Sequence, residues 1–232
     1  FGATTRALAL DPRGQGRSTI AAGGYDYGRR AADIGELLGA ARCRAPVVLV
    51  AWSLGVLESL QLMHDQRQGG QTTPVRALVL VDNSVGVGDP PASDPTFFNR
   101  LRARRRETVS GFVNAMFKRP PAPAWLDDLV EASLRTPLQV SIDLLRQNRP
   151  REFWRDALLA TEQPVLYAFT PRFAQQGEIV RQRKPQGIET RVFNEAGHAL
   201  FVDEPAAFNE LLERFVERTL GAQASPSGQA SG

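Results

Sequence analysis

The stretch Pro46-Val47-Val48-Leu49-Val50-Ala51-Trp52-Ser53-Leu54-Gly55 decides the fold of this chain. Its first part is a run of apolar, mostly β-branched residues, which is typical of a buried parallel strand. Ser53 then stands between two small residues, Ala51 and Gly55, and a segment with helical apolar spacing follows. A serine at such a strand-to-helix corner is strained and exposed, and small neighbours let the two backbones pass closely. Ser53 is therefore a candidate nucleophile, and the alternative is a serine that only forms a turn.

Strand and helix patterns alternate on both sides of this corner. Besides the strand that ends at Ser53, we predict strands at residues 5–10, 75–82, 164–169 and 188–193. Helices are predicted at residues 27–42, from 54 to about 66, and from Pro205 onward. Strands separated by helices imply parallel crossovers, so the expected fold class is α/β, with a mostly parallel sheet flanked by helices.

The alternation stops between residues 86 and 163. Prolines cluster at positions 90, 91 and 95 and again at 120, 121 and 123, with helical patterns between and after them. This predicts a mostly helical cap or lid insertion rather than an independent domain. We therefore divide the chain into a first core part (1–85), the insertion (86–163), a second core part (164–221) and a tail (222–232). The tail, rich in serine, glycine, alanine and glutamine, is predicted to be disordered.

The composition excludes several classes of protein. The 232 residues carry a net charge of only +3, and the basic run at residues 100–106 is interpreted as a solvated helix face, so no nucleic-acid partner is predicted. No run of about 18 apolar residues exists, which excludes a helical membrane span. Cys43 is the only cysteine, so neither a disulfide nor a metal site is expected. No cofactor is predicted, and a cytoplasmic location is favoured although no segment decides the compartment.

Three motifs follow one another in the chain: Asp11-x-Arg13-Gly14-x-Gly16-x-Ser18, Ala51-x-Ser53-x-Gly55 and Asn194-Glu195-Ala196-Gly197-His198-Ala199. Their order, spacing and element type resemble those of the α/β-hydrolase superfamily, in particular its single-domain bacterial members with a helical cap. The resemblance covers residues 1 to 220. It implies that Ser53 is the nucleophile, that His198 is the general base and that the backbone N–H of Leu54 is one oxyanion donor. The other histidine, His64, lies about 16 Å along the helix from Ser53, too far to serve.

The catalytic acid is where the sequence departs from the family. Most members carry an aspartate after the seventh strand, where this chain has Phe173, and Glu178 is the nearest carboxylate downstream. Some members take the acid from the end of the sixth strand, where Asp82 stands. A carboxylate at the C-terminal end of a strand faces the sheet edge at which ligand sites collect. Asp82 is therefore our candidate, and Glu178, or no functional acid at all, are the alternatives.

The family's third strand, and the loop after it that supplies the second oxyanion donor, have no counterpart in the sequence. In the family's sheet order that strand lies between the two that correspond to residues 5–10 and to the strand before Ser53. Unpaired interior strands are not tolerated in a buried sheet, so we expect an N-terminal portion of roughly 40 to 70 residues elsewhere, as another chain, a cleaved piece or a segment outside this sequence. A rearranged strand order from Phe1 onward is the alternative.

A serine at this corner, in place of the aspartate of dehalogenases and epoxide hydrolases, implies acyl chemistry. We predict a serine hydrolase that cleaves a small-molecule carboxylic ester with an apolar part, or a related acyl bond. The alternatives are an acyltransferase or cofactor-free perhydrolase, and a non-catalytic binding protein of the same fold. Trp52 either lines the acyl pocket or packs at the turn. The cap aromatics either line a pocket or form the cap's own core; they are Phe97, Phe98, Phe112, Phe117 and Trp125.

Overall fold

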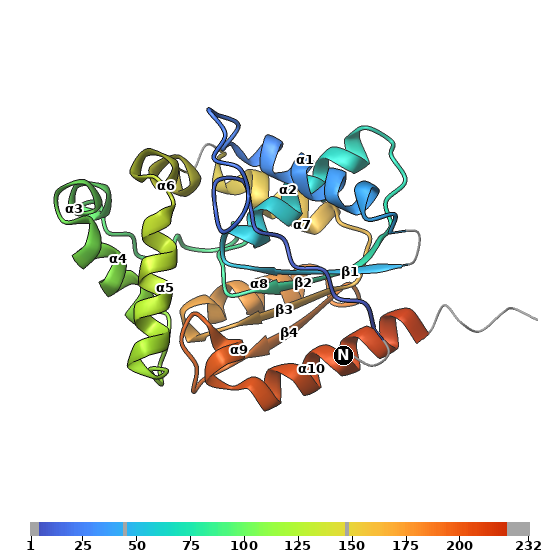
Figure 1. Ribbon diagram of the computed structural model, residues 1–232. Helices are drawn as coiled ribbons and strands as arrows, with labels where there is room; N and C mark the ends of the chain where they lie inside the picture. Colours follow the sequence, from blue (N-terminus) through green and yellow to red (C-terminus); the bar gives the residue numbers. More distant parts are fainter. Residues whose placement is uncertain (1–4, 44–45, 147–148, 222–232) are drawn as a thin grey trace, which may run out of the picture.

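The computed structural model describes residues 5–43, 46–146 and 149–221, and a four-stranded sheet lies at its centre (Figure 1). The strands are β1 (Val47–Trp52), β2 (Val75–Val81), β3 (Val165–Phe169) and β4 (Ile188–Val192). They are ordered β1-β2-β3-β4 in the sheet, and every pair is parallel. Trp52 is level with Val81, and Val81 with Ala168, so the carboxyl ends of neighbouring strands meet at one edge of the sheet.

The side chains of β2 alternate between two apolar layers. Leu78 and Leu80 face the layer formed by α1 (Tyr27–Ala40), α2 (Leu54–Gln68), α7 (Arg151–Ala160) and α8 (Ala174–Arg183). Ala77, Val79 and Val81 face the layer that contains the short α9 (Leu200–Asp203) and the long α10 (Pro205–Gly221). Figure 1 shows α10 on one side of the sheet and α1, α2 and α7 on the other. This two-sided burial explains why the β2 sequence is continuously apolar apart from one exposed position.

Between β2 and β3 the chain forms helices and no strand in its described part. Four of the helices lie together beside the core (Figure 1): α3 (Phe97–Ala103), α4 (Arg105–Asn114), α5 (Pro123–Arg135) and α6 (Leu138–Leu145). The next helix, α7, packs against α2 instead, although it falls within residues 86–163. A short 3₁₀ turn at Pro171–Phe173 follows β3. The division of the chain at residues 86 and 163 stays a prediction.

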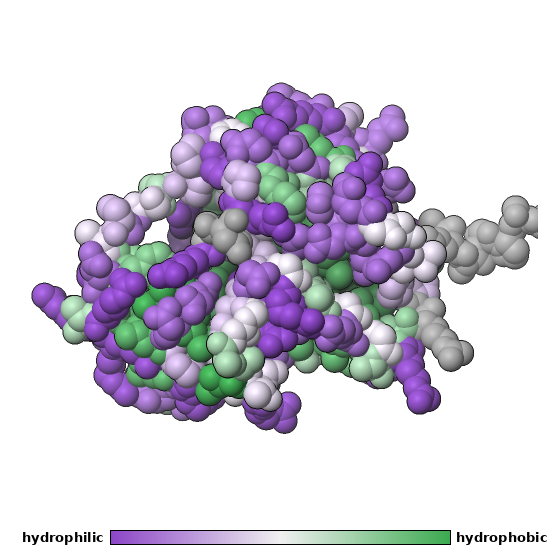
Figure 2. All heavy atoms as spheres, turned by 90° about the horizontal axis from the view of Figure 1, so that it is seen from above, coloured by the Kyte–Doolittle hydropathy of each residue, from purple (hydrophilic) through white to green (hydrophobic). Residues whose placement is uncertain are grey.

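The surface of the helical part is partly apolar. In the view of Figure 2, apolar side chains lie among polar ones on the part of the molecule that carries α3–α6. Phe112 and Trp125 are large apolar residues exposed in this region. Of the helices that the structure describes, none combines the length and the apolar character that a bilayer crossing requires.

The prediction of a strand at residues 5–10 is wrong. This segment is irregular and exposed throughout, and Leu8 and Leu10 are among the exposed large apolar side chains. A strand exists only through backbone pairing, and no strand neighbour for residues 5–10 occurs in the described part of the chain. For the same reason β1 is an edge of the described sheet, and its Val50 is 48% exposed. The described strands follow chain order without rearrangement, and the predicted tail at 222–232 lies outside the described residues.

Candidate active site

Ser53 occupies the sharp turn between β1 and α2. Its φ of 55° and ψ of −122° lie outside the regions that non-glycine residues ordinarily adopt. Two hydrogen bonds hold the turn: the Ser53 N–H donates to the Val81 carbonyl (3.0 Å), and Asn83 Nδ2 donates to the Ser53 carbonyl (2.7 Å). A Cβ at Gly55 would lie 3.7 Å from that of Ala51, so a larger side chain at either position would crowd the turn. These features present the Ser53 hydroxyl at the carboxyl edge of the sheet.

The loop of residues 194–199, called the histidine loop below, follows β4 and brings His198 to Ser53. His198 Nε2 lies 2.9 Å from Ser53 Oγ. Trp52 Nε1 donates to the His198 carbonyl (2.9 Å), and the Trp52 and His198 rings lie 5.1 Å apart. The His198 side chain is 26% exposed, so one part of the imidazole faces solvent while the rest is held by the turn and the loop.

Asp82 directly follows β2 and contacts the other ring nitrogen of His198. Its Oδ2 lies 2.8 Å from His198 Nδ1, and its Oδ1 accepts hydrogen bonds from the backbone N–H (2.7 Å) and the hydroxyl (2.8 Å) of Thr170. The Asp82 side chain is buried, and its φ of 48° places it in the left-handed region. A buried carboxylate fixed in this way can hold the imidazole in the tautomer that carries its proton on Nδ1.

Tyr167 on β3 connects the core to the serine turn. Burial, and secondly the negative charge of Asp82, raise the pKa of Tyr167 well above its ordinary value. The phenol therefore stays protonated at physiological pH, and it donates to the Asn83 carbonyl (2.8 Å). Because Asn83 also donates to the Ser53 carbonyl, these hydrogen bonds support the strained turn from the side of β3.

The structure brings Ser53, His198 and Asp82 together, and it separates the alternative acid from them. Glu178 lies on α8, where it accepts hydrogen bonds from Arg181 and Gln182. Leu54 is the first residue of α2, so its N–H stands at a helix N-terminus, where amides have no intrahelical acceptor. No cluster of three or more metal-ligating side chains occurs in the ranges 5–43, 46–146 and 149–221.

Trp52 and Phe117 pack at the base of the histidine loop. Trp52 is in edge-to-face contact with Phe201 (5.2 Å between ring centres), and both contact a cluster that includes Phe117 and Ala199. Trp52 therefore packs at the turn, as one of its two predicted roles requires. Side chains of α4 and α5 share this cluster, so these two helices touch the site through apolar contacts.

Three polar residues of this region were not predicted from the sequence. Thr170 directly follows β3, and Asn83 lies two positions after the end of β2, so the rule that singled out Asp82 would also have found them. The third, Asp203, ends α9 and accepts hydrogen bonds from three backbone N–H groups. Nothing in the local sequence marks it, because its donors come from segments up to 85 residues away.

Comparison with known proteins gives one family and many similar folds. A family model described as "Alpha/beta hydrolase family" matches residues 1–211. Among solved structures, an esterase (EaEST) from Exiguobacterium antarcticum is 22% identical over 89% of this chain and 79% of its own, with a TM-score of 0.74. The esterase RhEst1 from Rhodococcus sp. ECU1013 is 20% identical, over 90% and 78% (TM-score 0.72). A bromoperoxidase from Bacillus anthracis is 18% identical, over 89% and 79% (TM-score 0.73). The comparison with curated proteins found no match.

Proposed function

The chain belongs to the alpha/beta hydrolase family, and from this premise we propose that it is a serine hydrolase that cleaves a carboxylic ester through an acyl-enzyme on Ser53. One observation carries the proposal: the continuous contact from Ser53 Oγ through the His198 imidazole to the buried Asp82 carboxylate, at 2.9 and 2.8 Å. A serine hydroxyl is a weak nucleophile at neutral pH, and it needs a base in hydrogen-bond contact that is itself oriented by a third group.

In the first half of the reaction, Ser53 Oγ attacks the ester carbonyl carbon while His198 Nε2 takes the hydroxyl proton. Asp82 stabilises the imidazolium, which is a full charge next to a buried carboxylate. The N–H of Leu54 donates to the oxyanion that develops on the carbonyl oxygen. When the intermediate collapses, the carbon–oxygen bond to the alcohol breaks, and the alcohol leaves with the proton from His198.

In the second half, water attacks the acyl group on Ser53. His198 takes a proton from the water and returns it to Ser53 Oγ as the carboxylic acid leaves. An alcohol or hydrogen peroxide in place of water would give the acyltransferase or perhydrolase alternative, since both use the same acyl-enzyme. The partially exposed His198 ring and the apolar cluster beside it favour a small-molecule ester with an apolar part.

The test is covalent labelling with a fluorophosphonate probe, followed by peptide mapping. We expect one label per chain on Ser53, and labelling should be lost in Ser53→Ala. Ser133→Ala is the matched control, because Ser133 is an exposed serine on α5 whose hydroxyl donates to the Leu129 carbonyl. Hydrolysis of p-nitrophenyl butyrate should fall by at least about 10,000-fold in Ser53→Ala and stay unchanged in the control.

Two outcomes would contradict the proposal. A folded protein that is neither labelled nor active on any of a series of acetyl to octanoyl esters would favour the non-catalytic binding protein. Labelling that persists in Ser53→Ala would place the nucleophile elsewhere. Addition of methanol or hydrogen peroxide to the ester assay separates hydrolysis from acyl transfer and perhydrolysis, because the acyl group then appears as methyl ester or peracid.

A further inference from the structure

Asp203, the last residue of α9, is a buried carboxylate with three backbone donors. Its Oδ2 accepts from the N–H groups of Gly197 (2.7 Å) and Lys118 (2.9 Å), and its Oδ1 accepts from the N–H of Arg119 (2.9 Å). Gly197 belongs to the histidine loop, whereas Lys118 and Arg119 belong to the connection between α4 and α5. One carboxylate therefore joins two segments that are about 80 residues apart in the chain.

The donors suit an ionised carboxylate. Burial by itself would raise the pKa of Asp203, but the three backbone N–H groups outweigh it and hold the pKa below its ordinary value. The charged side chains on the segments that Asp203 joins are Lys118 and Arg119 in the α4–α5 connection and Glu195 in the histidine loop, which also carries the titratable His198; Glu204 follows Asp203 in the chain. At neutral pH Asp203 is thus a negatively charged acceptor, and an amide side chain at this position could offer only one acceptor oxygen.

The backbone on both sides of His198 is fixed to the same connection. Gly197, which precedes His198, shares the Asp203 carboxylate with Lys118, and the N–H of Ala199, which follows His198, donates to the Met116 carbonyl (2.8 Å). The approach is close, because a Cβ at Gly197 would lie 2.7 Å from the Met116 carbonyl oxygen. A shift of this connection would therefore move His198.

We propose that Asp203 is a positioning residue for catalysis, which locks the histidine loop to the α4–α5 connection so that the imidazole of His198 reaches both Ser53 and Asp82. The inference rests on the proposed function, since it assigns Asp203 a role in the same reaction. Asp203 touches no reacting atom and acts through the backbone of Gly197. Misplacement of a catalytic group by about 1 Å can cost about 100-fold in rate, so loss of one anchor has a kinetic effect of measurable size.

The chain offers a matched control for this carboxylate. Glu195 also joins the histidine loop to Lys118, but through an exposed ion pair between side chains (2.8 Å). Exposed pairs of this kind contribute little to the geometry or stability of a protein. Asp203→Asn and Glu195→Gln each remove one negative charge next to Lys118, and only the first weakens a backbone anchor of His198.

The experiment measures ester hydrolysis per active site, with sites counted by fluorophosphonate titration. Asp203→Asn should lower kcat about 10- to 100-fold with KM within about threefold, whereas Glu195→Gln should keep both values. Asp203→Glu keeps the charge and is measured in parallel; it should recover part of the lost kcat. A purely structural role would lower the number of titrated sites and leave kcat per site unchanged.

A second readout does not depend on turnover. His64 and His198 are the only histidines, so the ring protons of both can be resolved by NMR and assigned with a His64→Gln variant. The ring-proton chemical shifts of His198 at pH 7 should differ between wild type and Asp203→Asn, and they should not change in Glu195→Gln. Wild-type kcat and unchanged His198 ring-proton shifts in folded Asp203→Asn would overturn the inference while the proposed function stands. A wild-type protein without labelling or hydrolysis would instead contradict the proposed function.

Discussion

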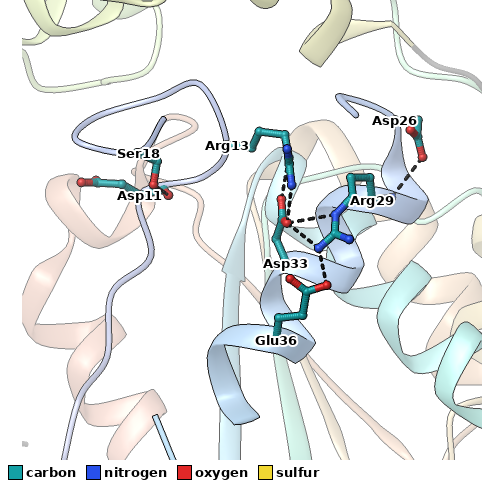
Figure 3. Close-up of polar contacts among 7 residues, drawn as sticks. All are labelled: Asp11, Arg13, Ser18, Asp26, Arg29, Asp33 and Glu36. Carbon is teal, nitrogen blue, oxygen red and sulfur yellow. Dashed lines mark hydrogen bonds and ion pairs between the residues drawn. The ribbon is translucent and has the colours of Figure 1, made fainter. Parts of the chain in front are cut away.

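The loop of residues 11–18, called the arginine loop below, and the histidine loop both contain glycine and charged residues, but different parts of the molecule hold them. Figure 3 shows Arg13 reaching from the arginine loop to Asp33 on α1, where it donates two hydrogen bonds of 2.8 and 2.6 Å. Arg29, one turn before Asp33, donates to the same carboxylate. Within the loop, the Ser18 hydroxyl donates to the Asp11 carbonyl (2.6 Å).

The hydrogen bonds of the histidine loop run instead to the carboxyl edge of the sheet, to α9 and to the α4–α5 connection. His198 contacts Ser53 and Asp82, and Gly197 donates to Asp203. Asp82 and Asp203 are buried and accept mainly from backbone or imidazole groups, whereas Asp33 is partly exposed and surrounded by arginines. Because exposed ion pairs contribute little, we interpret the arginine loop as a structural contact, and we place the proposed chemistry where buried carboxylates accept directional hydrogen bonds.

The largest expected effect tests the histidine loop directly. His198→Ala should lower kcat for ester hydrolysis by at least about 10,000-fold, because Ser53 loses the group that takes its proton. His64→Ala is the control; His64 packs its ring against Phe153 on α7, and its replacement should change kcat by less than about threefold. The measurement is steady-state hydrolysis on proteins whose circular dichroism matches wild type. Equal losses in both variants would contradict a special role of His198.

The next largest effect concerns the acid. Asp82→Asn should lower kcat by about 100- to 10,000-fold, because an amide in place of the carboxylate neither stabilises the imidazolium nor favours the correct tautomer. Glu178→Gln, the matched control at the alternative position, should leave kcat unchanged, since Glu178 is exposed and pairs with Arg181. If Glu178→Gln showed the larger loss, the acid assignment would have to be reversed.

A pair of glycine substitutions compares the two loops. In Gly197→Ala the new Cβ would approach backbone atoms, 2.7 Å from the Met116 carbonyl and 2.8 Å from the Lys118 nitrogen. These backbone atoms cannot move aside as a flexible side chain can, so the histidine loop should shift. We therefore expect kcat to fall about 10- to 100-fold and the free energy of unfolding to fall by about 2–3 kcal/mol. In Gly14→Ala the Cβ would meet side chains, 2.8 Å from Val140 Cγ1, at a φ of 75°.

Gly14→Ala should therefore cost about 1–2 kcal/mol of stability, from strain in the arginine loop, with kcat within about threefold of wild type. Urea unfolding and ester hydrolysis, measured on both variants, separate the two effects. If Gly14→Ala lowered kcat as much as Gly197→Ala does, the conclusion that only the histidine loop affects catalysis would be wrong.

The smallest effect belongs to the ion pairs of the arginine loop. Asp33→Asn should lower the free energy of unfolding by about 1 kcal/mol and leave kcat unchanged. Burial alone would raise the pKa of Asp33, but the hydrogen bonds from Arg13 and Arg29 lower it below its ordinary value. The stabilisation is therefore present above the ordinary pKa of about 4 and is lost as the pH falls through the folded value. Unfolding curves at pH 7 and pH 3 should show the difference between wild type and Asp33→Asn shrinking at pH 3.

Features that depend on short segments were predictable from the sequence. The buried runs ending at Ser53 and Asp82 form β1 and β2, and the family assignment based on three motifs is confirmed. The strand predicted at residues 5–10 is not formed, because an apolar alternation cannot reveal whether a neighbouring strand is there to pair with. Asp203 was not predicted for a related reason. Two of its hydrogen-bond donors, the N–H groups of Lys118 and Arg119, lie on a distant segment, and only folding brings them within 3 Å of its carboxylate.

The outer edge of β1 has a practical consequence for anyone who purifies this chain. Among the described residues no strand pairs with that edge. β1 also contains neither a charged side chain nor a proline, which would disfavour pairing with a strand of another molecule. At high concentration, molecules should therefore tend to associate by pairing their β1 edges, and the protein should precipitate. A lysine in place of the half-exposed Val50 should keep the protein dispersed at higher concentration, since native proteins protect open sheet edges with such charges.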